Sequence, residues 1–138
     1  MQLLNRESLL KRDELKIQKV NLTENEFVYV RQMTGRERDN FERSLMREFK
    51  NAKGQTDYEK NLGDFRAKLA VNTLCDEDGE MLLKPDDYET LSKNMSAFKL
   101  EKIVNESQKL NSITEEDKEE LVKNSTADLS DDSTSDSA

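Results

Sequence analysis

The stretch VYVRQMTGRERDNFE, from Val28 to Glu42, decides most of the expected fold because it changes from an extended to a helical pattern. β-Branched and aromatic residues dominate Phe27–Met33, which is typical of a strand. Thr34 and Glu37 then fit the capping-box pattern, in which each side chain accepts a hydrogen bond from the other residue's amide. The sequence therefore predicts a strand followed directly by a capped helix.

The predicted helix, over about 35–50, is amphipathic. Apolar Phe41, Leu45 and Phe49 recur every four positions and share one face. The remaining faces carry charged side chains, namely Arg36, Glu37, Arg38, Asp39, Glu42 and Arg43. We expect the apolar face to pack on the preceding strand while the charged faces remain in water.

That strand is expected to be the second half of a β-hairpin over residues 15–33. The segment LKIQKVNL at 15–22 is a first extended run, and TENE at 23–26 is a turn. Two strands alone are marginally stable, so helices should cover one face of the hairpin. Residues 1–14 are expected to form an N-terminal arm, for which a helix is one option.

Further helices are predicted over about 57–74, 86–94, 97–110 and 115–123. In the first of these, apolar residues follow spacings of four, three and four, at Tyr58, Leu62, Phe65 and Leu69. Gly63 weakens this helix by roughly 1 kcal/mol relative to alanine. Pro85 suits the first position of the 86–94 helix, and Ser96 is a suitable cap for the 97–110 helix.

The helix over 97–110 carries an apolar stripe formed by Leu100, Ile103, Val104 and Leu110. Stripes of this kind usually pack inside a domain, but they can also take a partner helix. Both interpretations stay open at this point, and the stripe is the candidate partner-binding surface.

The segment CDEDGEMLL at 75–83 contains Asp78 and Gly79, a pair that indicates a tight turn. Its carboxylates also suggest calcium. An EF-hand loop, however, needs a glycine at its sixth position and a glutamate at its twelfth. A loop that starts at Asp76 places Met81 and Asp87 there, so the turn is the preferred interpretation.

Composition favours one thin-cored domain over 15–123. The 138 residues are 33% apolar and 38% charged, with a net charge of −8. Residues 124–138 contain four acids and no bases, and we expect them to form a disordered acidic tail. The expected fold is α+β and mainly helical: an N-terminal β-hairpin, four or five amphipathic helices, and that tail.

Most function classes find little support in these residues. Histidine is absent, and Cys75 is the only cysteine, so general-base, nucleophilic and zinc chemistry lack their usual residues. We expect no catalytic, metal or cofactor site. The acidic charge argues against nucleic acid, and no apolar run is long enough for a membrane span. An intracellular binding protein is the expected class.

Four segments in this order resemble the tail assembly chaperones of long-tailed, siphovirus-type bacteriophages: EFVYVRQMTGRERDNFE, LCDEDGEMLL, KPDDYETLSK and LEKIVNESQKLN. The resemblance covers about residues 15–123. The motif positions, which we expect to be structural, are Thr34, Gly35, Arg36, Glu37, Arg38, Phe41, Asp76, Asp78 and Gly79. The chain departs from the family pattern at 51–64, where NAKGQTDYEKNLGD lengthens the gap between the first two helices.

This resemblance implies a non-enzymatic role in the host cytoplasm. Such proteins bind the long, helical tape measure protein, keep it soluble, and help to recruit the tail tube protein around it. Self-association of the chain is a further open option.

The alternative function is an acidic interaction protein, such as a nucleic-acid mimic that inhibits a basic host factor. A mimic needs carboxylates spaced like phosphates, whereas 26 acids and 22 bases are intermixed before the tail.

Overall fold

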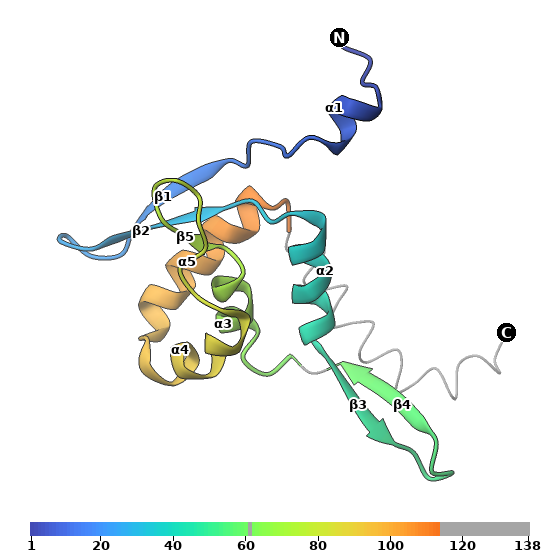
Figure 1. Cartoon of the computed structure of the whole chain (residues 1–138). Helices are drawn as coiled ribbons and strands as arrows, with labels where there is room; N and C mark the ends of the chain where they lie inside the picture. The colour runs from blue at the N-terminus through green and yellow to red at the C-terminus, as the bar shows by residue number, and fades with distance from the viewer. Residues whose placement is uncertain (61, 114–138) are drawn as a thin grey trace, which may run out of the picture.

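A three-stranded antiparallel sheet forms the centre of the computed structural model, which describes residues 1–60 and 62–113 (Figure 1). β1 (Ile17–Asn21) pairs with β2 (Phe27–Arg31), and β2 pairs on its other side with β5 (Leu74–Cys75). The strand order is therefore β1-β2-β5, and β1 lies at an edge of the sheet.

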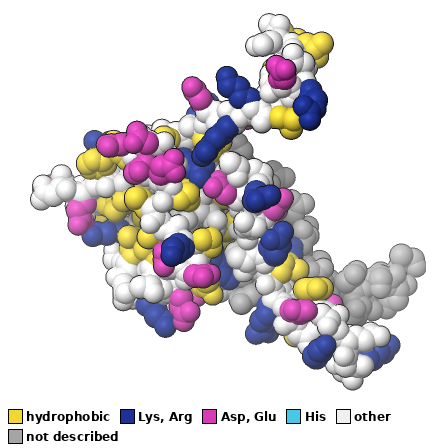
Figure 2. Space-filling view, in the orientation of Figure 1, with side chains coloured by type: hydrophobic (Ala, Val, Ile, Leu, Met, Phe, Trp, Pro, Cys, Tyr) yellow, Lys and Arg dark blue, Asp and Glu magenta, His cyan; other side chains and the backbone are white. Residues whose placement is uncertain are grey.

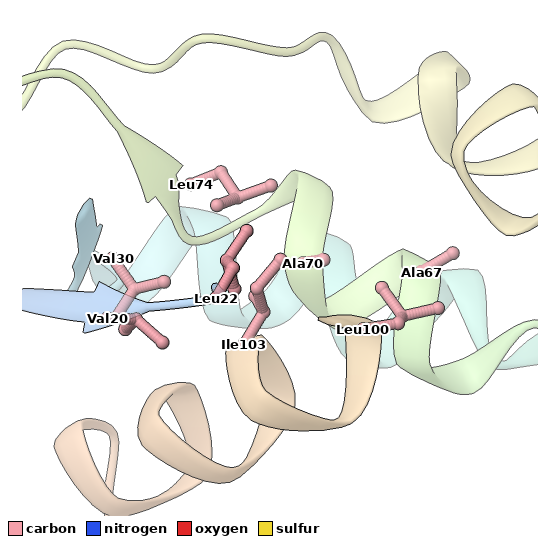
Figure 3. Close-up of a cluster of buried hydrophobic side chains, with 8 residues drawn as sticks. All are labelled: Val20, Leu22, Val30, Ala67, Ala70, Leu74, Leu100 and Ile103. Atoms are coloured by element: carbon pink, nitrogen blue, oxygen red, sulfur yellow. The ribbon is translucent and has the colours of Figure 1, made fainter. Parts of the chain in front are cut away.

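Two helices complete the main core. α5 (Ala97–Leu110) contacts β1 and β2, and α3 (Phe65–Val71) packs against α5. Successive side chains of a strand face opposite sides, so every second residue of β1 and β2 points toward these helices. Figure 3 shows the resulting first core cluster, which consists of Val20, Leu22, Val30, Ala67, Ala70, Leu74, Leu100 and Ile103.

A second core cluster forms where α2 (Gly35–Ser44) meets α3 and α5. Its buried residues are Phe41, Leu45, Leu69, Val104 and Ile113. α3 and α5 contribute to both clusters, because each helix presents apolar side chains on two sides. The hydroxyl of Thr73, just after α3, and that of Ser107 on α5 form a buried hydrogen bond of 2.9 Å.

The predicted order of elements was wrong. The helix α1 (Arg6–Leu10) precedes the strands, so the chain does not begin with a hairpin. The described residues form five α-helices and five strands in two separate sheets, whereas one hairpin followed by helices was expected. A helix was one option for this arm, and the capping box of Asn5 and Ser8 explains it, because each side chain accepts a hydrogen bond from the other residue's amide.

The predicted helix over 35–50 ends early. α2 stops at Ser44, Leu45 is its C-cap, and the chain continues as β3 (Met46–Lys50). β3 pairs with β4 (Thr56–Lys60) to form a two-stranded sheet that we call the outer hairpin. The turn and the second strand of the outer hairpin therefore come from the segment 51–64, which lengthens the gap between the first two predicted helices.

The predicted helix over 57–74 was also placed too early. It begins only at Phe65, after Asp64, whose backbone has a left-handed φ of 59°. Of the four residues that suggested the helix, Phe65 and Leu69 lie on it, whereas Tyr58 belongs to β4. A left-handed residue cannot continue a right-handed helix, so the apolar spacing across Asp64 was coincidental.

The end of the described chain matches the sequence prediction more closely. The 3₁₀ helix η1 (Pro85–Asp87) begins at the proline and leads into α4 (Tyr88–Asn94). The predicted bounds of α5 and its cap are confirmed, since the Ser96 hydroxyl accepts a hydrogen bond from the Lys99 amide at 3.2 Å. The predicted helix over 115–123 and the predicted tail lie outside the described residues.

Within the described ranges, the structure contains no helix that combines the length and the apolar character needed to cross a membrane.

The predicted tight turn after β5 is present and depends on Gly79. Gly79 has a φ of +86°, and its amide donates to the Asp76 carbonyl at 3.0 Å. The Asp76 carboxylate accepts from the amides of Asp78 and Glu80 at 2.8 and 3.0 Å. A side chain at Gly79 would approach Ile17 Cδ1 to 3.3 Å, so the turn lies close against the outer face of the sheet.

Replacing Gly79 with alanine is expected to lower the free energy of unfolding by about 1–2 kcal/mol, because L-residues disfavour left-handed backbone. Chemical denaturation followed by circular dichroism measures this change. The matched control is Gly35→Ala, since a Cβ at Gly35 meets nothing within 4 Å. That control should leave stability unchanged or raise it by up to about 1 kcal/mol. Equal stability of the two variants would contradict the turn geometry.

Candidate partner-binding surface

The apolar stripe of α5 is not exposed to a partner. Leu100, Ile103 and Val104 are 6%, 0% and 1% exposed, and they belong to the two core clusters. Leu110 is half-buried and packs against the first core cluster. A partner could reach this stripe only if α5 left the sheet, so the stripe is core and the candidate surface lies elsewhere.

The family-motif residues around the start of α2 hold that junction together. The Thr34 hydroxyl accepts from the Glu37 amide at 3.2 Å, and the Glu37 carboxylate accepts from the Thr34 amide at 2.9 Å. The predicted capping box is therefore confirmed. Arg38 pairs with Glu42 and donates to the Asn111 carbonyl at 3.3 Å, which connects α2 to the end of α5.

The other motif positions differ in burial. Phe41 is fully buried in the second core cluster, whereas Gly35 and Arg36 are exposed at the start of α2. Asp76 and Gly79 shape the turn after β5, and Asp78 is exposed within it. The structure therefore brings these positions together in two places, an N-cap and a turn, and not in one cleft.

A partly buried ion pair joins β2 to α2, with Glu37 25% exposed. The Arg31 side chain is 4% exposed and lies 2.7 Å from the Glu37 carboxylate. Burial raises the pKa of Glu37, but the Thr34 amide and the Arg31 guanidinium outweigh this effect and hold the pKa below its ordinary value. The Asn111 carboxamide accepts from the Met33 amide at 2.7 Å beside this pair. These contacts fix the junction of sheet and helix.

Cys75 is buried, and burial raises the pKa of its thiol above the ordinary value. The thiol is therefore protonated at neutral pH, which is the state of a structural cysteine. Elsewhere in the described ranges, no group of three or more histidine, cysteine, aspartate or glutamate side chains is placed to hold a metal ion.

Most of the exposed large apolar side chains lie on two segments that extend from the body. One is the N-terminal arm, residues 1–14, which includes α1 (Figure 1). Leu3, Leu4, Leu9 and Leu10 of this arm are 97%, 48%, 64% and 69% exposed, and α1 buries none of its residues. Figure 2 shows apolar and charged side chains next to one another on this arm.

The second segment is the outer hairpin, residues 46–60. Met46, Phe49 and Tyr58 are exposed on it, and an ion pair between Arg47 and Glu59 joins its two strands. Residues directly opposite one another share a face, so Phe49 and Asp57 lie on one side while Tyr58 and Glu48 lie on the other. Among residues 1–60 and 62–113, no further strand pairs with either edge of this hairpin, and exposed side chains lie on both of its faces.

Elements of these two kinds are weakly stable alone. A helix of one or two turns is too short to persist in water without tertiary contacts, and an isolated two-stranded hairpin is only marginally stable. Exposed leucine and aromatic side chains on such elements favour a contact that buries them. The arm and the outer hairpin together form the candidate partner-binding surface.

Sequence reasoning did not locate this surface. The leucine pairs at 3–4 and 9–10 are visible in the sequence, and a leucine-rich arm outside the domain was the available signal. The outer hairpin gave no such signal, because its apolar residues fit the helical spacing of the neighbouring segments.

Comparison with known proteins adds no relative: no protein-family model, curated protein or solved structure matches this chain. Its function is therefore inferred from its own residues and their arrangement.

Proposed function

We propose that this protein is a non-enzymatic tail assembly chaperone of a long-tailed bacteriophage. In this role it binds and solubilises the tape measure protein in the host cytoplasm and helps to recruit the tail tube protein. The observation that carries the proposal is the cluster of exposed leucines on an arm whose helix buries none of its own residues. The order of sequence motifs from residue 15 to 123 supports the same class.

A long helical partner would suit this surface. Such a chain exposes apolar stripes along its length and aggregates if they are left uncovered. Leu9 and Leu10 on α1 can pack beside a partner helix, while the outer hairpin offers aromatic side chains at a second position. Two weak contacts on one molecule act together, because the first raises the effective concentration of the second.

Charge supports the solubilising part of this role. The chain carries a net charge of −8, and like charge on neighbouring bound copies opposes their aggregation. Apolar contacts would supply the affinity, and the carboxylates would keep the complex dispersed.

Co-expression with a tape measure fragment tests the proposal. The wild-type chain should bring the fragment into the soluble fraction, measured by centrifugation and gel densitometry. The double variant Leu9→Glu/Leu10→Glu should reduce the soluble fragment by about fivefold or more, since it places two charges in an apolar contact. The fold of the body should be unchanged, because α1 buries no residue.

A matched control separates the arm from charge in general. Leu82→Glu/Phe98→Glu also adds two charges at exposed apolar positions, which are 56% and 64% exposed, but away from the arm. This control should solubilise the fragment like the wild type. An insoluble fragment with the wild-type chain would exclude the chaperone role. Equal loss in both double variants would exclude the arm as the contact.

A further inference from the structure

The outer edge of β1 has no neighbouring strand among residues 1–60 and 62–113. Hydrogen bonds at both ends of the hairpin show which backbone groups face that edge. The Gln32 amide donates to the Lys16 carbonyl at 3.0 Å, and the Leu22 amide donates to the Glu26 carbonyl at 2.9 Å. Even-numbered residues therefore face β2, and the backbone groups of Ile17, Lys19 and Asn21 face outward.

A groove of about 360 Å³ runs beside this edge, between β1 and the flank of α5. Lys19, Val20 and Asn21 line it from the strand, and Lys102, Glu106 and Lys109 line it from the helix. An extended peptide that entered the groove could pair with the outward backbone groups of β1, and its alternate side chains would face α5.

The charges of the groove select the kind of peptide. Lys102 and Lys109 face one glutamate, Glu106, which is already paired with Lys109 at 3.5 Å. Lys19 lines the groove only from the strand, because its Nζ lies 4.4 Å from the Phe27 ring centroid on the other face of the sheet. Lys102 donates to the Leu22 carbonyl at 3.2 Å and lies 4.4 Å from the Phe98 ring centroid, so its ammonium has no carboxylate partner among these contacts. The groove thus presents an excess of positive charge on a chain that is acidic as a whole.

We propose that this groove binds an extended peptide segment rich in carboxylates, which adds as a further strand to the edge of β1. Backbone pairing supplies affinity, and the lysines select acidic side chains. A second copy of this chain fits less well, because its own lysine-lined edge would meet the same positive charge. This inference does not depend on the chaperone proposal.

A fluorescein-labelled peptide Asp-Val-Asp-Val-Asp-Val-Asp tests the site. Fluorescence anisotropy should show saturable binding to the full chain, and no binding of the lysine counterpart Lys-Val-Lys-Val-Lys-Val-Lys. The variant Lys102→Gln/Lys109→Gln should weaken binding by about tenfold, because it removes the two cations that line the groove from α5. The control Lys53→Gln/Lys93→Gln removes the same charge at exposed positions that do not line the groove, and it should bind like the wild type.

Strand pairing is tested separately from charge. Asn21→Pro removes an outward amide without changing any charge, and proline is tolerated on an edge strand where the amide faces solvent. Binding should be lost while the melting temperature stays near that of the wild type. If this variant does not fold, a peptide that carries N-methyl groups at alternate amides replaces it and should not bind.

Four results would overturn the inference. The first is no saturable binding of the acidic peptide, and the second is equal weakening by the two lysine variants. The third is unchanged binding of both the Asn21→Pro chain and the N-methylated peptide. The fourth is a concentration-dependent dimer in sedimentation that Asn21→Pro dissociates and the acidic peptide does not, since it would assign the β1 edge to a second copy.

Discussion

Replacing Ile103 with alanine is expected to lower the free energy of unfolding by about 3 kcal/mol, through lost apolar burial and the cavity left behind. Ile103 is 0% exposed and lies in the first core cluster, where α5 meets the sheet (Figure 3). Alanine is the strongest helix former, so the loss would come from packing and not from the helix itself. Urea denaturation followed by circular dichroism measures it, with the dependence on urea concentration unchanged.

Phe98→Ala is the control on the same helix. Phe98 is 64% exposed, so its loss should change stability by no more than about 0.5 kcal/mol. The comparison also decides the role of the α5 stripe. If Ile103 faced a partner instead of the core, both variants would unfold like the wild type, and only binding would suffer.

α5 could be predicted from the sequence because its signals are local. The apolar spacing of Leu100, Ile103 and Val104 agrees with the helical period, and Ser96 precedes the helix as its cap. The sequence of one helix does not show which other elements cover its apolar stripe. That coverage depends on β1, β2 and α3, whose placement is a property of the whole fold.

The outer hairpin could not be predicted, because its residues carry no alternating pattern. Every residue of β3 is exposed, so neither face selects apolar side chains, and Phe49 kept the four-residue spacing of α2. The end of α2 depends on a distant residue, since the Ser44 carbonyl accepts a hydrogen bond from Lys68 Nζ at 2.8 Å. A cation at a helix C-terminus stabilises that end, and nothing near Ser44 in the sequence announces it.

The candidate surface was missed for a related reason. Apolar residues were assigned to helix faces that were assumed to be buried, whereas exposure is decided by which elements lack a neighbour. Tyr58 illustrates this: it fits a helical spacing with Leu62, yet it lies on β4 and is 61% exposed. The motif positions Thr34 and Glu37, in contrast, were assigned correctly because a capping box is completed within four residues.

The second large effect is expected at Glu37, where Glu37→Gln should lower the free energy of unfolding by about 2–3 kcal/mol at neutral pH. Glutamine can still cap α2, so the change isolates the lost charge. Arg31 would remain buried without its counter-charge, and its Nε already has no hydrogen-bond partner among the residues that the structure describes. The double variant Arg31→Met/Glu37→Gln should recover part of the loss, because no buried charge is then left unpaired.

The same variant should reveal a pH dependence. The pKa of Glu37 is lower in the folded chain than in the unfolded chain. The Glu37 charge therefore makes its full contribution to the free energy of unfolding at pH values above the ordinary carboxylate pKa. This contribution is lost as the pH falls from about 4.5 through the folded pKa, because the carboxylate that faces Arg31 then takes up a proton. The stability difference between wild type and Glu37→Gln should therefore be largest near pH 7 and shrink steadily below about pH 4.

Glu101→Gln is the matched control for this prediction. Glu101 pairs with Arg66 at 2.6 Å, but the two side chains are 43% and 54% exposed, so the pair should contribute less than about 1 kcal/mol. Urea denaturation of the wild type and both variants at several pH values gives the comparison. A Glu37→Gln penalty that stayed constant from neutral to acidic pH would show that the carboxylate charge is not what stabilises the junction of β2 and α2.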